Sequence, residues 1–446
     1  MYKKVHLYCF LFLFFFISLI FIFTLSRGDT FVNYGFSYAI RLGEIPYKDF
    51  NMVITPFAPF LYSLGLFIYN DIVMFYIEQA IVLTVMFYIL EKMLGSKVIL
   101  YLLFMILPFP IAMVSTMYPG YNFMLIFLFI LFIYCFKENK SDYILGVILG
   151  LIFCTKQTVG IICFVPTFYY LFNNKKKFLM ILVGYLMPCL LLFLYLLINN
   201  CLGSFFNLCL LGLFDFGHSN FQINYFYLIL FIIGVLYLLF SIINGKNKLL
   251  LCYGLCFGVL VFPIIDYYHV SLFLLIVFYF FVDSIEYDKK INRFFIFLII
   301  TICIAWIVVL LNYFPNISVS NKNHFHFVIN DKKYNDNVDS LIDYVKSTNS
   351  NIVYFMRGSE NYYYKIINDE RIDYFDLPNY GNYGYNGIDK MKNKIDKISN
   401  SYFIIDSELI NNSDSSQQYI KELGKYLIEK SKYVKKIGLY NIYYKS

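Results

Sequence analysis

The densest group of ionisable residues in the apolar part of this chain lies in a stretch of twenty-three residues near its start. That stretch holds the carboxylates Asp29, Glu44 and Asp49 and the cations Arg27, Arg41 and Lys48. Polar groups beside hydrocarbon are costly, and proteins usually keep them for a purpose. Carboxylates at a water interface can accept a proton from a hydroxyl, and cations there can bind phosphate oxygens.

Asp29 is the candidate general base. It follows Gly28 and precedes a predicted interfacial helix from Thr30 to Leu42, so it can also serve as the N-cap of that helix. Asp49 lies in the run from Ile45 to Phe50, where proline fixes a turn and a neighbouring lysine can neutralise it. We take Asp49 as the second catalytic candidate, which would orient the acceptor or share a cation with Asp29.

Cations at the level of the lipid headgroups are candidate ligands for a donor phosphate, which needs charge-assisted hydrogen-bond donors. The candidates are Arg27, Arg41, Lys48 and Lys156, with Gln157 beside the last of them. The alternative for each cation is a side chain that extends along apolar surface to reach the membrane interface. Lys156 is the strongest candidate, because it stands between two predicted helices and no other cation is predicted on the outer face between residue 70 and the C-terminal part.

Asp266 and His269 lie three residues apart, and Asp215 and His218 repeat this spacing. Such a pair lies one helical turn apart and would permit a divalent metal, but it is also typical of an ordinary hydrogen-bonded pair. We therefore assign no metal, and a divalent cation stays an open alternative. His324 and His326, which follow the last predicted helix, are assigned no role.

The composition excludes an ordinary soluble protein. Of the 446 residues, 60% are hydrophobic, and the mean hydropathy is +0.64, so the chain needs lipid as its solvent. The net charge of +7 does not indicate nucleic acid, because the cations of the apolar part lie mainly in short loops between apolar segments. The ten cysteines all precede Pro315 and include no CxxC pair, so a disulfide framework for the C-terminal part is excluded.

The first apolar segment, from about Val5 to Leu25, is long enough to cross a membrane and lacks a signal-peptide cleavage pattern, so we read it as a permanent anchor. Ten further spans are predicted at about 71–91, 98–114, 120–136, 142–155, 157–172, 178–199, 225–243, 249–265, 270–284 and 294–313. The segment from Phe57 to Tyr69 is too short for a crossing and is predicted to be a half-buried helix on the outer face. With eleven spans, the lysine-rich loops lie in the cytosol and the ionisable candidates meet on the outer face.

The composition changes after Pro315 to mixed polar and apolar sequence. Short apolar runs at 352–356, 402–406 and 440–444 alternate with segments of helical periodicity, which predicts a small α/β domain with a mainly parallel sheet. The predicted organisation is a polytopic α-helical membrane domain over 1–313, with interfacial helices in its first outer loop. An extracytoplasmic α/β domain over 314–446 follows it.

At these residues the chain resembles the glycosyltransferase-C superfamily, specifically its bacterial family-39-like group of enzymes that use polyprenyl-phosphate sugars. The matching features are Gly28-Asp29, the run Gly43 to Phe50 followed by Thr55-Pro56, the run Gly150 to Gly160, Phe262-Pro263 before Asp266-Tyr267-Tyr268-His269, and in the C-terminal part Tyr374 to Asn379 and Gly381 to Gly384. Members commonly have an Asp-Glu pair where this chain has Asp29-Thr30. That departure leaves Asp29 as the sole candidate there and makes a bound metal less certain.

The resemblance implies transfer of a sugar from a polyprenyl-phosphate donor to a glycan, lipid or protein acceptor on the outer face of a bacterial plasma membrane. The leaving phosphate is already stable, so it needs cations rather than a protonating acid. With Asp29 as general base, we expect a single displacement with inversion, in which Asp266 and His269 steady the donor. The expected partners are this donor, the acceptor and membrane lipids, with no nucleic acid.

Three other functions stay open at this point. A polymerase or ligase of surface polysaccharide would use the same compartment, but a pyrophosphate-linked donor should need more arginine on the outer face. A transporter or flippase of a lipid-linked glycan would place ionisable groups near the middle of the membrane, whereas here most gather at one face. An inactive membrane scaffold whose C-terminal part binds cell-wall material is the third. The sequence leaves the sugar, the acceptor, the lipid length and the oligomeric state undefined.

Overall fold

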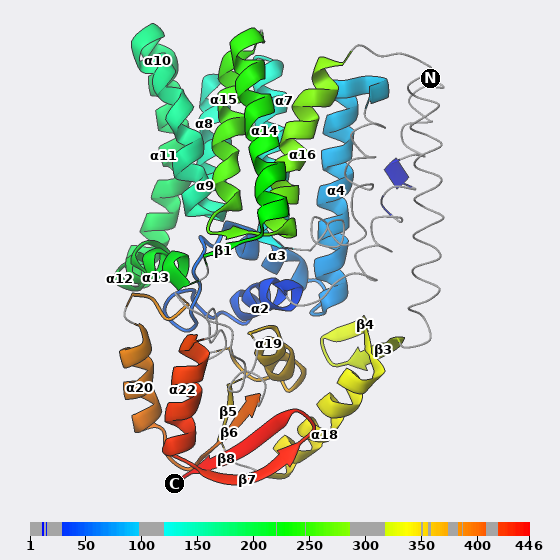
Figure 1. Cartoon of the computed structure of the whole chain (residues 1–446), viewed down its shortest axis with the longest axis vertical. Coiled ribbons are helices and arrows are strands. Elements are labelled where there is room, and N and C mark those ends of the chain that lie inside the picture. The colour runs from blue at the N-terminus through cyan, green and yellow to red at the C-terminus, as the bar shows by residue number, and fades with distance from the viewer. Residues whose placement is uncertain are drawn as a thin grey trace.

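A bundle of long helices and a smaller part built around a sheet make up the chain (Figure 1). The computed structural model describes residues 11–12, 15, 29–97, 120–219, 221–245, 247–285, 317–348, 351–355, 358–372, 382–385, 387–406 and 418–446. The smaller part, residues 317–446, lies at one end of the bundle and is called the C-terminal part below. Most of the predicted anchor and the predicted spans 98–114 and 294–313 lie outside the described residues.

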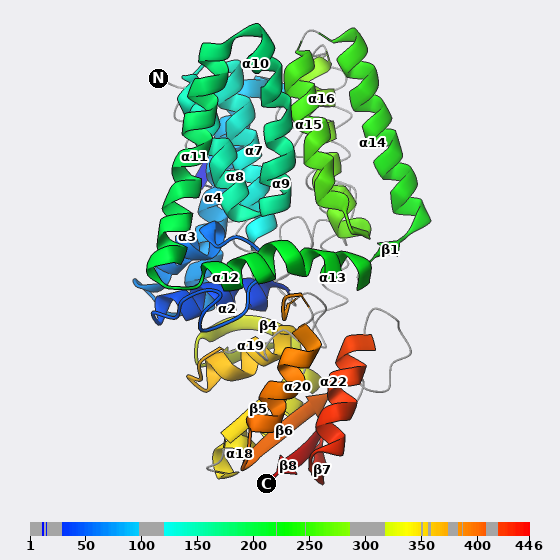
Figure 2. The same ribbon diagram turned by 90° about the vertical axis from the view of Figure 1, so that its left-hand side faces the viewer.

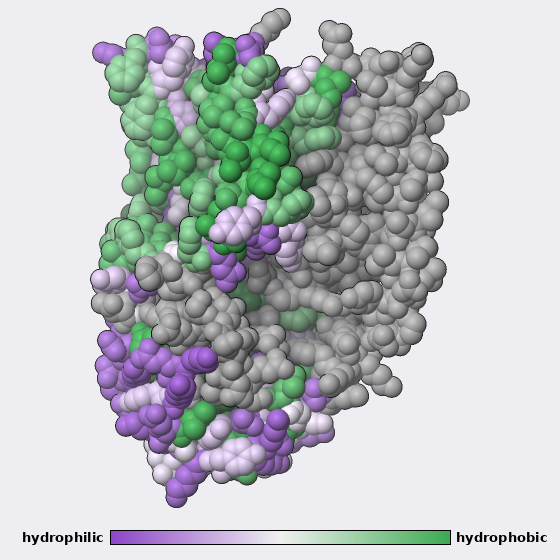
Figure 3. Space-filling view, viewed as in Figure 1, coloured by the Kyte–Doolittle hydropathy of each residue, from purple (hydrophilic) through white to green (hydrophobic). Residues whose placement is uncertain are grey.

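Four helices among the described residues are long and apolar enough to cross a membrane, so this is a helical membrane protein. They are α4 (Ile72–Leu94), α11 (Lys175–Ile198), α14 (Tyr225–Asn244) and α16 (Tyr267–Ser284). Shorter helices complete the bundle: α7 (Tyr121–Lys137), α8 (Asp142–Thr155), α9 (Gln157–Phe164), α10 (Phe168–Asn173) and α15 (Lys248–Phe257), with short turns η1 (Gly95–Lys97), η2 (Val165–Thr167) and η4 (Gly258–Val261). On the face shown in Figure 3, the coloured residues of the bundle are mostly hydrophobic and those of the C-terminal part are more hydrophilic.

The described lysines of the predicted cytosolic loops lie at the ends of helices that are farthest from the C-terminal part (Figure 1). Lys92 and Lys137 lie in the last turns of α4 and α7, and Lys175 begins α11. Lys137 also forms a 2.6 Å ion pair with Asp283 near the end of α16. The two ends of the bundle therefore differ in charge as the sequence predicts.

Short helices lie across the other end of the bundle, between it and the C-terminal part (Figure 2). They are α2 (Asp29–Arg41), α3 (Phe57–Leu66), α12 (Leu202–Phe205), the π-helical turn η3 (Phe206–Leu211) and α13 (Gly212–Ser219). We call them the end helices. The predicted helix at 30–42 matches α2 to within one residue. The predicted half-buried segment contains α3, where Tyr62 and Leu66 are buried while Leu64 is 60% exposed.

The C-terminal part has a sheet of four strands with helices on both faces. The sheet order is β5 (Asn351–Phe355), β6 (Ser401–Asp406), β8 (Tyr440–Lys445) and β7 (Lys432–Ile437). Because strand side chains alternate, Val353 and Phe355 face α20 (Gly387–Lys397) and α22 (Gln418–Glu429), while Tyr354 packs into the cluster that contains α18 (Lys332–Thr348) and α19 (Gly358–Ile367). The prediction of a mainly parallel sheet is wrong, because β5 and β6 are parallel but β8 is antiparallel to both β6 and β7.

The C-terminal part packs against the bundle through aromatic side chains of α19 and α2. Tyr362 of α19 lies so close to Gly35 that a β-carbon there would meet its ring at 2.1 Å. Tyr363 stacks on Phe31, with ring centroids 5.4 Å apart. Any larger residue at position 35 would push the two helices apart, so the sequence at this point is set by the contact between the two parts.

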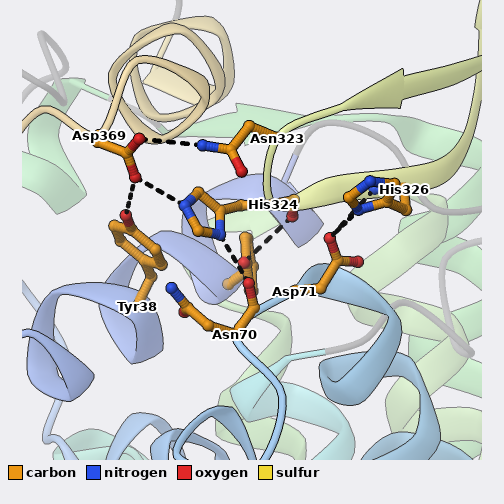
Figure 4. Close-up of polar contacts among 8 residues, drawn as sticks. Tyr38, Asn70, Asp71, Asn323, His324, His326 and Asp369 are labelled. Atoms are coloured by element: carbon orange, nitrogen blue, oxygen red, sulfur yellow. Dashed lines mark hydrogen bonds and ion pairs between the residues drawn. The ribbon is translucent and has the colours of Figure 1, made fainter.

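A β-hairpin of the C-terminal part, β3 (Ile317–Lys322) and β4 (Phe325–Asp331), also contacts the bundle through two histidines (Figure 4). His326 Nδ1 lies 2.6 Å from Asp71 Oδ2, while Asp71 Oδ1 accepts the Val73 amide and caps α4. Nδ1 of His324 lies 2.6 Å from the Asn70 carbonyl oxygen, and its Nε2 lies 2.7 Å from Asp369 Oδ1. His324 therefore connects the turn before α4 to the segment that follows α19.

We predict that the Asp71–His326 contact couples the two parts of the protein. Asp71→Ala should lose the cap of α4 and the His326 contact together and lower the free energy of unfolding by about 1–2 kcal/mol. Asp71→Ser keeps an oxygen for the Val73 amide and should lose less. In a double-mutant cycle with His326→Ala, thermal unfolding in detergent should give a coupling energy above about 0.5 kcal/mol.

Val319→Thr, on the exposed face of the same hairpin, is the matched control and should leave stability unchanged. Strictly additive effects of Asp71→Ala and His326→Ala would contradict the coupling.

Candidate functional site

Polar residues from four elements meet at the end of the bundle that faces the C-terminal part. Asn33 of α2 accepts a hydrogen bond from the Tyr121 amide at 3.3 Å and so caps the start of α7. Asn122, which follows Tyr121 in α7, donates to the hydroxyl of Tyr268 in the first turn of α16 at 2.9 Å. We call Asn33, Tyr121, Asn122, Lys156 and Tyr268 the junction cluster.

Lys156 supplies the positive charge of the junction cluster. It is the residue between α8 and α9, with an extended backbone that ends one helix and begins the next. Its ammonium nitrogen lies 5.5 Å from the centre of the Tyr121 ring, which is a cation–π contact. Within the described ranges it has no carboxylate within ion-pair distance, so its charge is available to an anion.

Gln157, which the sequence places beside the predicted phosphate ligand Lys156, bonds to backbone carbonyl groups in the structure. Its amide nitrogen donates to the carbonyl oxygens of Val53 at 2.9 Å and of Cys209 at 2.7 Å. Thr55 donates to the Phe153 carbonyl oxygen at 2.7 Å in the same region. These bonds fix the chain segment that follows α2 against the joint of α8 and α9, so Gln157 positions the site.

Asp266 and His269 form the predicted pair beside the junction cluster. Asp266 is the N-cap of α16, and its Oδ1 lies 2.9 Å from both the backbone nitrogen and the ring Nδ1 of His269. Burial opposes ionisation of this carboxyl, but the bonds from His269 outweigh it, so the pKa of Asp266 lies below its ordinary value. The parallel pairing of β1 (Gln222–Ile223) with β2 (Ile264–Ile265) fixes the chain just before this pair.

Asp29 is the first residue of α2 and lies one helical turn before Asn33, so its backbone is adjacent to the junction cluster. Arg27 lies outside the described residues, as does the side chain of His218 in the second Asp-x-x-His pair. Among the described residues, no group of three or more metal-ligating side chains is present. Asp266 and His269 are joined by the hydrogen bond described above.

Three other predicted residues have local contacts of their own, and Arg41 stands at the opposite end of α2 from Asp29. Arg41 is twelve residues after Asp29, which is about 18 Å along a helix, and its Nε donates to the Leu66 carbonyl oxygen at 3.4 Å. Lys48 is exposed, and the exposed Asp49 accepts the Ile45 amide at 2.7 Å within its own turn. Glu44 of the same region is buried, 3.8 Å from Arg371 of the C-terminal part.

The sequence interpretation missed Asn33, Asn122 and Tyr268 as parts of the site. Asn122 and Tyr268 lie in polar segments that interrupt the apolar sequence after a proline, and this pattern could have identified them. Asn33 lies inside a helix, where no sequence pattern distinguishes it. Comparison of the chain with protein-family models, with curated proteins and with solved structures gives no match.

We predict that the Asp266 carboxylate stabilises α16 and that this effect depends on pH. Asp266→Ala should cost about 1 kcal/mol of stability because the helix loses its cap. Asp266→Ser keeps an oxygen for the His269 amide and isolates the contribution of the ring contact. A carboxyl with a lowered pKa stabilises the fold above its ordinary pKa of about 4, and the effect is lost as the pH falls further.

Thermal unfolding in detergent at pH 7 and near pH 3.5 measures this effect. The parent protein should lose stability at the lower pH. Asp266→Asn keeps the cap but does not ionise, so it should lose less stability over the same pH change. An identical pH profile for the parent protein and Asp266→Asn would show that this carboxyl has no such role.

Proposed function

We propose that this protein is a membrane glycosyltransferase. It moves a sugar from a polyprenyl-phosphate donor to a lipid-linked or cell-surface acceptor on the outer face of a bacterial plasma membrane. In this proposal the chain crosses the membrane about eleven times through residues 1–313, and residues 314–446 form an α/β domain outside. The support for this orientation is the charge difference between the two ends of the bundle, since lysine-rich loops favour the cytosol.

Lys156 is the observation that carries the proposal. It is a half-buried cation at the end of the bundle facing the C-terminal part, held over the Tyr121 ring, with no ion-pair partner in the described part of the chain. A lysine in this position can donate to the oxygens of a lipid phosphate that lies at the headgroup level. As the bond to the sugar breaks, the same charge stabilises the leaving phosphate, so no protonating acid is needed.

Asp29 is the general base of the proposed reaction. It takes the proton of the acceptor hydroxyl while that oxygen attacks the anomeric carbon and the bond to the phosphate oxygen breaks. One displacement of this kind inverts the configuration of the sugar. Its support is the position of Asp29 one turn before Asn33, which links α2 to Tyr121 and hence to Lys156.

Asp266 and His269 complete the donor side, where the imidazole, oriented by its carboxylate partner, would contact the donor sugar or its phosphate. In this proposal Arg41, Lys48 and Asp49 take no part in bond breaking. Arg41 lies at the opposite end of α2 from Asp29, and Asp49 is bonded within its own turn beside Lys48. Most of the described ionisable groups of the bundle lie at its two ends, which does not favour a transporter with a site at mid-membrane.

We predict that Asp29→Asn lowers turnover at least a hundredfold, the usual scale of general-base catalysis, while the protein stays folded. The assay uses purified protein and a polyprenyl-phosphate sugar and measures the release of polyprenyl phosphate. Lys156→Met should lower kcat/KM for the donor about tenfold or more, and Lys156→Arg should restore part of it.

Lys140→Met, at the opposite end of the bundle, is the matched control for the loss of one cation and should leave turnover unchanged. Equal turnover in Asp29→Asn and the parent protein would remove Asp29 from the reaction.

We further predict the orientation of the chain. Val434, on an exposed strand of the C-terminal part, should react as Val434→Cys with a membrane-impermeant maleimide added to intact cells. Lys140→Cys, in the loop between α7 and α8, should react only after the membrane is opened. The parent protein is the background control, since the eight cysteines of its described part are buried or half-buried. Labelling of Lys140→Cys alone in intact cells would reverse the orientation.

A further inference from the structure

A cavity of about 350 Å³ lies between the end helices and the C-terminal part, separate from the junction cluster. One wall comes from α12 and η3, and the opposite wall comes from α20 and the turn before it. Tyr47 and Asn51 of the segment after α2 complete the lining. The volume is near the lower end of the range for small-molecule sites, so it suits a small headgroup.

The lining of this cavity is positively charged. Lys390 and Lys394 are four residues apart on α20, so they lie on one face of the helix and both reach the cavity. Ser204, Asn207 and Asn51 add hydroxyl and amide groups, and the lining residues that the structure describes include no carboxylate. Two cations with neutral hydrogen-bond donors and no acid are the arrangement that binds an oxyanion.

Two carboxylates of the neighbouring helices have partners outside this cavity. Glu422 of α22 pairs with Lys392, and Asp396 of α20 accepts the hydroxyl of Tyr426 at 2.8 Å. Neither carboxylate lines the cavity. The lysines of α20 therefore face both ways, with Lys390 and Lys394 at the cavity and Lys392 paired with α22.

The wall around Asn207 is tightly built. Lys390 Nζ lies 3.3 Å from Asn207 Oδ1, and a β-carbon at Gly384 would meet the same oxygen at 1.9 Å. Gly384 has a φ of +78°, which also favours glycine. The C-terminal part is thus seated on η3 at this point, and the cavity is a defined space between the two.

The cavity lies beside a helical segment with exposed apolar side chains. In η3 and the adjoining α13, Phe206 is 41%, Leu211 46% and Phe214 73% exposed. A helix of this kind lies in the plane of the membrane interface with its apolar face in the lipid. An anion in the cavity would therefore be at the depth of a phospholipid phosphate.

We propose that this cavity binds a phosphate ester presented at the membrane surface, through Lys390, Lys394 and the side chains of Asn207 and Ser204. The chemistry fits the headgroup of an anionic lipid, and the same donors would accept free phosphate. The assignment does not depend on the transferase activity, because it concerns a separate set of residues.

The test is native mass spectrometry of the full protein in detergent, titrated with phosphatidylglycerol, phosphatidylcholine or inorganic phosphate. Phosphatidylglycerol should stay bound in preference to phosphatidylcholine, and Lys390→Gln with Lys394→Gln should weaken its binding about tenfold. Lys397→Gln with Lys425→Gln removes the same charge from exposed positions outside the lining and should have little effect.

Gly203→Leu provides a variant that keeps the charge. A β-carbon at Gly203 has nothing within 4 Å, so a leucine side chain has room to enter the space and should block the lipid as strongly as the lysine changes do. Competition by inorganic phosphate would identify the free ion as the ligand, and retention of the lipid despite added phosphate would identify the headgroup. The proposal would be wrong if both double lysine variants lost lipid binding equally, or if the protein showed no preference for the anionic lipid.

Discussion

One buried carboxylate, Asp71, links the helical bundle to the C-terminal part of this protein. Its side chain is 2% exposed and stands at the N-terminus of α4, where the partial positive charge of the helix favours an anion. One oxygen caps the helix and the other accepts the ring and amide of His326. Since α4 is long and apolar enough to cross a membrane, this contact ties the C-terminal part to the start of a candidate membrane span. The helix α2 is then enclosed between the bundle and α19, and the junction cluster depends on the position of α2.

The irregular segment after α2 shows how a membrane protein can hold polar backbone close to lipid. Non-helical backbone is tolerated at that depth only where protein groups satisfy it. Here Gln157 donates to Val53, Thr55 donates to Phe153, and Tyr47 donates to the carbonyl oxygen of Ile54 at 2.6 Å. Gln157 of α9 therefore bonds to this segment from outside, whereas Thr55 and Tyr47 belong to the segment and bond to α8 and within the segment itself.

The hydropathy of the sequence and the periodicity of its apolar residues predicted several helices and strands. They could not predict contacts between residues far apart in the sequence. The span at 142–155, the helix α2, and strands β5, β6 and β8 fall where apolar runs and periodicity indicate. Strand β7 was missed because its sequence, KYVKKI, is polar and its residues are mostly exposed, and this hairpin partner makes the sheet mixed. The hairpin histidines had no assigned role, since Asp71 lies 255 residues before His326 and no spacing rule spans that separation. Lys156 stood out as an isolated cation, whereas its partner Tyr121 became evident only from the fold.

The segment after α2 contacts two cationic regions, the cavity beside α20 and the joint of α8 and α9 that carries Lys156. Tyr47 and Asn51 line the cavity beside α20, while Val53 and Thr55, a few residues on, bond to the joint that carries Lys156. A transferase whose donor and acceptor are both attached to lipid phosphates needs two separate anion sites at the same membrane face. Reaction by a single displacement also needs the acceptor to approach opposite the leaving phosphate. A rigid segment with contacts at both regions fixes the distance between them, and this is the geometric condition that such a displacement requires.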